Sequence, residues 1–174
     1  LDITTPLSIE NSFNTAEGQF SVDASGVVTF TPVLNFFGQS TLSYTVQNTN
    51  PTPETSSPAL ITVTIGAVND IPTISSLADQ TIDEDDQTGL LDFTVDDVET
   101  DPVLLIVTAS SDNTMLVPAS NIVLQGNGTN RTVQVTPLAD QFGVANITLT
   151  VEEGDDTNET TFTVTVTSVN DLPT

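Results

Sequence analysis

The stretch "RTVQVTPLADQFGVANITLTV" (Arg131–Val151) decides the fold of this chain. In both of its halves apolar residues alternate with Thr, Gln or Asn, which is the period of a half-buried β-strand. Between the halves stand Pro137, Asp140 and Gly143, residue types that interrupt strands and form turns. The stretch therefore predicts two strands joined by a loop.

Further strand patterns of the same kind occur along the whole chain, and no window has a convincing helical period. A tight hairpin turn is predicted at Ala24–Gly26, between two strand patterns. The fold class predicted from these patterns is all-β. The clearest strand segments outside the opening stretch are Gly18–Pro32, Ser40–Val46, Ala59–Ile65 and Thr161–Thr167.

An internal repeat divides the chain. "TFTPVLNFFGQSTLSYTV" (Thr29–Val46) aligns without a gap to Gln134–Val151, at an offset of 105 residues. "AVNDIPT" (Ala67–Thr73) recurs as "SVNDLPT" (Ser168–Thr174) at an offset of 101 residues, because the first copy has a longer loop at Asn48–Pro58. Two copies of one unit therefore follow one another, and each ends in Val-Asn-Asp.

The repeat predicts two tandem Ig-like or cadherin-like antiparallel β-sandwiches. Seven short strands in about 100 residues are typical of an Ig-like sandwich. The first unit is too short for its two opening strands, so it is predicted to be truncated rather than a shorter variant, and a further repeat is expected after Thr174. The predicted divisions are a partial sandwich at 1–68, a linker at 69–72, a complete sandwich at 73–169 and the start of the next linker at 170–174. The seven strands of the second sandwich are expected from Thr73, at Leu90–Val95, at Val103–Ala109, around Met115–Leu124, and at Arg131–Thr136, Ala145–Val151 and Thr161–Thr167.

The charge of the chain excludes several classes of partner. It has 24 acidic residues and one basic residue, Arg131, with a formal net charge of −23. Nucleic acids and anionic membrane surfaces need basic residues, so we expect neither nucleic-acid binding nor membrane insertion. There is no Cys and no His, which excludes thiolate zinc sites and nucleophilic catalysis with a His base. Arg131 is expected to pair with a nearby carboxylate.

Acidic residues that are far apart in sequence should meet at the two ends of the second sandwich. Its first strand begins at the end where the second-to-third and sixth-to-seventh strand loops lie, and the remaining acidic segments share the opposite end. Bare carboxylates about 4 Å apart repel each other by ~1 kcal/mol in water and ~4 kcal/mol at an effective dielectric of 20. Calcium, which prefers six to eight oxygen ligands in flexible geometry, is the predicted counter-ion. The segments are Asn69-Asp70, Asp96–Asp101 and Glu152–Asp156 at one end, and Asp83–Asp86, Asp140 and Asn170-Asp171 at the other.

The segments "TIDEDD" (Thr81–Asp86), "FTVDDVET" (Phe93–Thr100) and "TFTVTVTSVNDLPT" (Thr161–Thr174) resemble the cadherin-like tandem repeats of large bacterial surface proteins, including RTX-type adhesins. The resemblance covers the second unit and the latter half of the first. It implies extracellular β-sandwiches that bind calcium near their junctions and act as extenders, with neighbouring repeats of the same chain as partners. Other domains of the parent protein would contact a host or biofilm surface.

The resemblance also implies a set of metal ligands. The first unit departs from the pattern, because it has Gln47-Asn48 and Asn35 where acids are expected. A single ion held mainly by the second unit is therefore expected at the linker between the units. The implied calcium ligands are Asn69, Asp70, Asp97, Glu99, Glu153, Glu84, Asp85, Asn170 and Asp171.

Other functions remain as alternatives. A carbohydrate- or partner-binding module is the main competitor, since calcium in the loops could itself touch a sugar. An enzyme is not expected. The pair Glu152 and Glu153, or Asp96 and Asp97, could serve glycoside hydrolysis, but they lie on loops without the aromatic platform of a sugar site, and the chain has no Trp and one Tyr. The Thr ladder at Thr161–Thr167 is similar to ice-binding arrays, but Thr is also the ordinary polar residue of a strand.

Overall fold

The computed structural model describes residues 12–48 and 50–170, which belong to two compact units, Leu1–Val68 (unit 1) and Asn69–Thr174 (unit 2). The predicted all-β class is confirmed: the described residues form strands and loops, with a single 3-10 turn at Ala119–Asn121. Among these residues no helix is long and apolar enough to span a bilayer.

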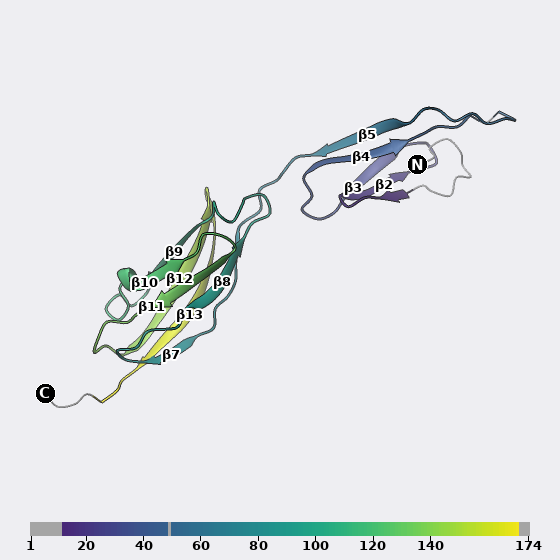
Figure 1. Cartoon of the computed structure of the whole chain (residues 1–174). Coiled ribbons are helices and arrows are strands. Elements are labelled where there is room, and N and C mark those ends of the chain that lie inside the picture. The colour runs from purple at the N-terminus through teal and green to yellow at the C-terminus, as the bar shows by residue number, and fades with distance from the viewer. Residues whose placement is uncertain (1–11, 49, 171–174) are drawn as a thin grey trace. The chain divides into compact units, whose positions relative to one another are not determined.

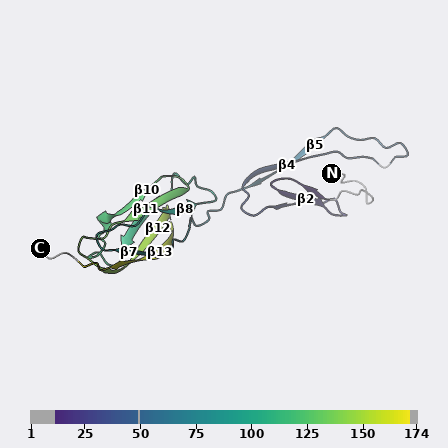
Figure 2. The same cartoon turned by 60° about the horizontal axis from the view of Figure 1, so that its bottom comes forward.

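Unit 2 is a sandwich of two four-stranded sheets (Figures 1 and 2). All strand pairs are antiparallel except the parallel pair β7–β13. This strand order is that of an Ig-like sandwich, as the sequence predicted. One sheet has the order β10 (Ile122–Gln125), β11 (Asn130–Val135), β8 (Leu91–Asp96) and β6 (Thr73–Ile74); the other has β7 (Gln80–Asp83), β13 (Asp156–Thr167), β12 (Gly143–Glu153) and β9 (Ile106–Ser111).

The core of unit 2 lies between the two sheets. The alternation seen in the sequence places every second residue of β11, β12 and β13 on the inner face, where most are buried completely. These side chains exclude water from the contact of the two sheets, which is the main stabilising contribution expected for a sandwich. The buried side chains of this core include Phe93, Val95, Leu105, Leu116, Val117, Ile122, Val133, Val135, Ile147, Leu149, Val151, Phe162, Val164 and Val166.

Three strand predictions for unit 2 need correction. The fourth strand, expected around Met115–Leu124, begins only at Ile122, after a turn at Met115 and the 3-10 turn. The strand beginning at Thr73 is divided, because the chain leaves β8 after two paired residues and joins β13 as β7. The crossing is held by the carboxylate of Asp79, which accepts a hydrogen bond from the Thr163 backbone N–H at 2.7 Å. The third strand begins at Ile106 rather than Val103, since Asp101 caps a turn through the Val103 N–H at 3.0 Å.

Unit 1 contains a three-stranded sheet, β1 (Ser12–Asn14), β2 (Gly18–Val22) and β3 (Val28–Pro32), and a separate pair, β4 (Gly38–Tyr44) and β5 (Ala59–Ile65). The turn predicted at Ala24–Gly26 is confirmed. The Asp23 carboxylate accepts hydrogen bonds from the backbone N–H groups of Ser25 at 2.8 Å and Val27 at 2.9 Å, as in an Asx turn.

The sequence repeat is also a repeat of backbone conformation. At the offset of 105 residues, Asn35 corresponds to Asp140, and their φ angles are 60° and 57°. Gly38 corresponds to Gly143, and both have positive φ angles, 115° and 141°, that favour glycine. The corner between β3 and β4 in unit 1 is therefore built like the corner between β11 and β12 in unit 2.

The two units differ in how well the repeated strands are covered. In unit 2, β9 pairs with the outer edge of β12 and β7 with that of β13, whereas β4 and β5 pair only with each other among the described residues. Leu149 is 0% exposed, but its counterpart Tyr44 is only half-buried. The same difference separates β5 from β13. The inward residues of β13 are at most 3% exposed, whereas the residues of β5 at the same register positions are half-buried. The corresponding pairs are Ile61 and Phe162, Val63 and Val164, and Ile65 and Val166.

This difference predicts that unit 1 opens more easily than unit 2. Partly exposed aliphatic side chains forfeit about 25 cal/mol for each Å² left in water, and uncovered strands open at lower free energy. Native-state hydrogen exchange should show backbone amides of β4 and β5 exchanging at least about tenfold faster than those of β12 and β13. Equal protection of the two strand pairs would show that the pairing of β12 with β9 and of β13 with β7 does not affect opening.

Candidate metal centre

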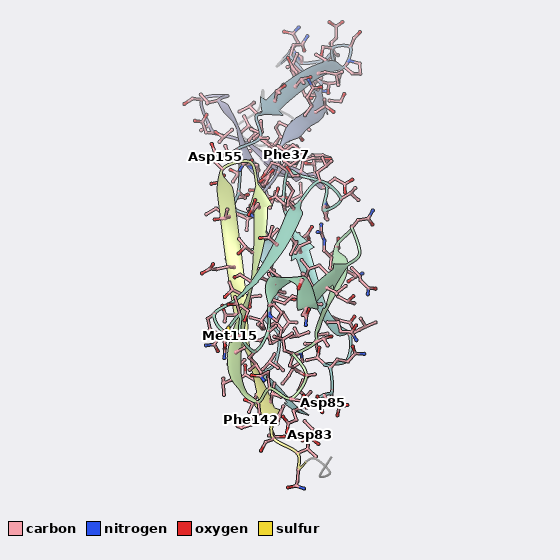
Figure 3. All side chains as sticks on the ribbon, turned by 90° about the vertical axis from the view of Figure 1, so that its left-hand side faces the viewer. Phe37, Asp83, Asp85, Met115, Phe142 and Asp155 are labelled. Atoms are coloured by element: carbon pink, nitrogen blue, oxygen red, sulfur yellow. The ribbon has the colours of Figure 1, made fainter. Side chains whose placement is uncertain are left out.

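One end of unit 2 is built around the turn of the β12–β13 hairpin. Sequence reasoning treated Glu152–Asp156 as a loop, but only Gly154 and Asp155 form the turn, and Glu153 pairs with Asp156 across the two strands. Gly154 has a φ of 57°, as such a tight turn requires. Asp155 lies at the tip of the hairpin (Figure 3). The strand pairing therefore brings the carboxylates of Glu153 and Asp156 side by side.

Asn69 bridges these two carboxylates. Its Nδ2 donates to Asp156 Oδ2 at 2.9 Å and to Glu153 Oε2 at 3.4 Å. The two carboxylate oxygens are therefore at most 6.3 Å apart, the sum of the two hydrogen-bond lengths. At about 6 Å two negative charges repel by ~0.7 kcal/mol in water and ~3 kcal/mol at a dielectric of 20. A neutral amide offsets only part of that repulsion.

The β8–β9 loop adds two further acids to this end. The Asp70 backbone N–H donates to Glu99 Oε2 at 3.0 Å, and the Thr100 hydroxyl donates to Glu153 Oε1. Asp97 Oδ1 accepts hydrogen bonds from the N–H groups of Glu99 and Thr100 at 2.9 and 2.8 Å. We call Asn69, Asp70, Asp97, Glu99, Glu153 and Asp156, with Thr100, the linker cluster.

The second carboxylate oxygen of Asp97 has no hydrogen-bond partner, although it is buried. A buried charged oxygen without a partner is costly, because it loses its hydration and gains nothing in return. Such an atom needs an explanation, and a bound ion or water is one that fits an acidic cluster.

The linker that carries Asn69 and Asp70 is fastened to unit 2. Besides the contacts above, Pro72 is fully buried, and its carbonyl accepts a hydrogen bond from Asn158 Nδ2 at 3.0 Å. The residues at 69–72, predicted as a linker, thus follow the surface of unit 2 and do not hang free.

A second group of acids lies at the opposite end, where Figure 3 shows Asp83 and Asp85. Glu84 is 7% exposed, and its Oε1 accepts a hydrogen bond from the Val169 N–H at 2.7 Å. Asp85 Oδ1 accepts one from the Asp140 N–H at 3.0 Å, and Asp83 Oδ1 accepts one from the Thr167 hydroxyl at 2.5 Å. These carboxylates are satisfied by donors of their own end.

The predicted ligands fall into two groups at opposite ends of unit 2, the division that strand order predicts. The structure brings Asn69, Asp70, Asp97, Glu99 and Glu153 together at the linker, and places Glu84 and Asp85 at the far end beside the strand exit. Asn170 is exposed at that far end, and Asp171 lies outside the described residues. Within residues 12–48 and 50–170, no three acidic side chains are drawn together tightly enough to form a preformed metal cluster.

Two members of the linker cluster were missed by sequence reasoning. Asp156 became recognisable only through its register opposite Glu153, although the acidic segment that contains it had been noted. Thr100 carries no signal in the sequence, because Thr is common in this chain and its role depends on the folded loop.

The linker cluster passes a simple test of fit for a hard cation. Its donors are carboxylate, amide and hydroxyl oxygens, which Ca²⁺ prefers, and the buried Asp97 Oδ2 is left without a partner. The carboxylates are spaced by N–H and O–H donors, so a bound cation would have to replace some of these hydrogen bonds.

Comparisons with known proteins agree with the fold. Residues 2–64 match the family model of a bacterial Ig domain. No significant match was found among curated proteins. The match to unit 1, the internal repeat and the strand order of unit 2 together identify the chain as a pair of Ig-like repeats.

Solved structures that resemble the chain do so only distantly. A titin–obscurin-like 1 Ig complex is 14% identical, covers 58% of this chain and 98% of its own, and has a TM-score of 0.43. Domains 4 and 5 of the S-layer protein SbsC are 16% identical, with 85% and 90% coverage and a TM-score of 0.47. An endo-fucoidan hydrolase of glycoside hydrolase family 107 is 18% identical, with 91% and 23% coverage and a TM-score of 0.41. At these values no functional argument follows.

The crowding of charge in the linker cluster predicts an effect of neutralising Asp97. In EDTA, Asp97→Asn should raise the melting temperature of unit 2 by several degrees, since removing ~1 kcal/mol of repulsion shifts a domain of this size by about 4–8 °C. The amide oxygen still caps the Glu99 and Thr100 N–H groups. Calorimetry measures the shift.

Asp101→Asn is the matched control. It removes the same charge from the same loop and keeps the cap on the Val103 N–H, but Asp101 takes no part in the linker cluster. A rise of equal size in both variants would trace the effect to net charge alone, and a lower melting temperature for Asp97→Asn would contradict the repulsion.

Proposed function

We propose that the chain is a calcium-stiffened extender repeat of a large bacterial cell-surface adhesin. The observation that supports this most directly is the buried, unpartnered Asp97 Oδ2 in a cluster of acids that joins the linker to unit 2. The role is mechanical and not catalytic: the repeats hold other domains of the parent protein away from the cell.

The residues that would hold the ion are those of the linker cluster. Asp97 offers its free oxygen, while Glu99, Glu153 and Asp156 offer carboxylates that now accept hydrogen bonds from neutral donors. Bound there, a divalent cation would neutralise their mutual repulsion. The absence of any Lys, and the use of Arg131 elsewhere, leave the cluster without a cation of its own.

Calcium suits this donor set better than other metals. The chain has no Cys or His for zinc, and magnesium demands stricter octahedral geometry and gives up its water reluctantly. Extracellular calcium modules bind in the range of about 10⁻⁴–10⁻³ M. A site of that affinity fills outside the cell and stays mostly free of calcium inside it, which matches a surface protein.

Calcium would act on the linker. β5 ends at Ile65, and Asn69 is the first residue of the linker cluster along the chain. An ion that fastens Asn69 and Asp70 more firmly leaves only the three residues at 66–68 to act as a hinge. A shorter hinge has fewer conformations, so consecutive repeats are held in a narrower range of orientations.

A location at the bacterial surface is supported by the bacterial Ig family match and by the resemblance of the repeats to those of adhesins. The partners proposed are the neighbouring repeats of the same chain. The strongly acidic surface adds solubility and repels other acidic surfaces, as an extended surface structure requires.

Calcium should protect unit 2 from trypsin. Arg131 is the only site for this protease in the chain, and it is 8% exposed in β11, so cleavage requires unit 2 to open. At 100-fold excess over the dissociation constant, calcium adds ~2.7 kcal/mol and should slow cleavage about 100-fold when opening is in equilibrium. The appearance of the two fragments, followed by mass spectrometry, gives the rate.

The matched variants sharpen this test. Asp97→Asn should lose most of the calcium protection, while Asp101→Asn should keep it. Magnesium at the same concentration controls for ionic strength. Identical cleavage rates in calcium and in EDTA would rule out calcium binding to unit 2.

The extender role makes a separate prediction. Small-angle scattering should show a narrower distribution of interunit distances in calcium than in EDTA, because the hinge is shorter when Asn69 and Asp70 are held. Asp97→Asn should give the broad distribution in both conditions. If calcium protects unit 2 from trypsin but leaves the scattering unchanged, the ion stabilises the fold without stiffening the linker.

A further inference from the structure

The sequence suggested that Arg131 would pair with a carboxylate, but its side chain has no such partner in the part of the chain that the structure describes. All of its hydrogen bonds go to backbone carbonyls: Nη2 donates to Pro102 and Leu105, both at 2.8 Å, and Nε to Gly128 at 3.1 Å. The side chain is 8% exposed, and burial lowers the pKa of its guanidinium group. The one basic residue of a chain with 24 acids is thus used inside the fold.

Arg131 holds the C-terminal part of the β8–β9 loop. The N-terminal part of the same loop carries the members of the linker cluster that follow β8. The loop consists of two turns in series, each capped by an aspartate: Asp97 caps the first, and Asp101 caps the second through the Val103 N–H at 3.0 Å. Pro102 and Leu105, whose carbonyls Arg131 holds, belong to the second turn and its exit. The position of the first turn therefore depends on the anchor of the second.

We infer that Arg131 is a positioning residue for the calcium site, an inference that rests on the proposed function. By fixing the loop through these carbonyls, the guanidinium removes ordering that a cation would otherwise have to impose, and so raises the affinity of the site for the cation. Its positive charge acts in the opposite direction, because it repels a nearby cation. The sign of the affinity change on removing Arg131 therefore separates positioning from simple electrostatics.

The planar guanidinium is suited to this task. It donates to three carbonyls of two different loops from one rigid group, which the single ammonium of lysine cannot reproduce in the same geometry. Arg131→Lys keeps the charge and most of the stem, whereas Arg131→Met keeps the stem and loses the charge and the donors.

The test is calorimetric titration of calcium into the wild-type chain, Arg131→Lys, Arg131→Met and Val166→Ala. Val166 is 3% exposed in β13 and pairs with Gly143, at the end opposite the linker cluster, so its truncation lowers stability without touching the loop. We expect Arg131→Met to bind about 10–100-fold more weakly, as when outer supports of metal ligands are lost, Arg131→Lys to fall between it and the wild type, and Val166→Ala to bind normally.

Each outcome decides a different question. If the wild-type chain binds no calcium, the proposed function fails. If the wild type binds, and Arg131→Met binds equally or more tightly, the positioning role is wrong. An affinity loss of the same size in Val166→Ala would make Arg131 an ordinary contributor to stability. If Arg131→Met does not fold in EDTA, the calcium affinities of Arg131→Lys and Val166→Ala are compared instead. Weaker binding by Arg131→Lys alone supports the positioning role, and equal affinities contradict it.

Discussion

Repulsion between carboxylates is the constraint on which the rest of this structure depends. The chain has one basic side chain, and the fold uses it to hold carbonyls of two loops. Every acidic group that the fold draws together must then be satisfied by neutral donors or by ions from solution. At the far end of unit 2 neutral donors suffice, since Glu84, Asp85 and Asp83 each accept a hydrogen bond from a neighbouring N–H or hydroxyl. At the linker they do not, because one oxygen of Asp97 is left over.

The fold could be predicted from the sequence because its signals are local and repeated. A period of two identifies a strand whose one face is buried, and the gapless repeat relates the sequences of β11 and β12 to those of β3 and β4. Positions such as Asp140 and Gly143 have positive φ angles in both copies, so the turn chemistry and the repeat agree. The division of the first strand into β6 and β7 was not predictable in this way. It depends on pairing with β13, which is about 85 residues away in the chain.

The candidate site was predictable in its grouping and not in its detail. Strand order alone places the linker, the β8–β9 loop and the β12–β13 turn at one end, so Asn69, Asp97 and Glu153 could be placed together from topology. The turn at Asp97 determines which of its oxygens lacks a partner. Oδ1 accepts hydrogen bonds from two backbone N–H groups, and Oδ2 accepts none. The role of Arg131 could not be predicted either, since a lone cation among many acids suggests an ion pair, and only the folded loop shows that carbonyls take its place.

The contacts of Asn69 and Asp70 explain in physical terms why Val-Asn-Asp stands at the first junction. Asn69 and Asp70 bind unit 2 through donors, the Asn69 amide and the Asp70 N–H, that occupy the spaces between carboxylates. These hydrogen bonds already dock the linker, so the proposed cation would strengthen this arrangement without having to create it. An amide also offers an oxygen on its other side, so under the proposed function the Asn69 side chain would turn that oxygen toward the cation. A lysine at this position would neutralise the acids permanently, whereas Asn adds no charge and leaves their neutralisation to the proposed cation.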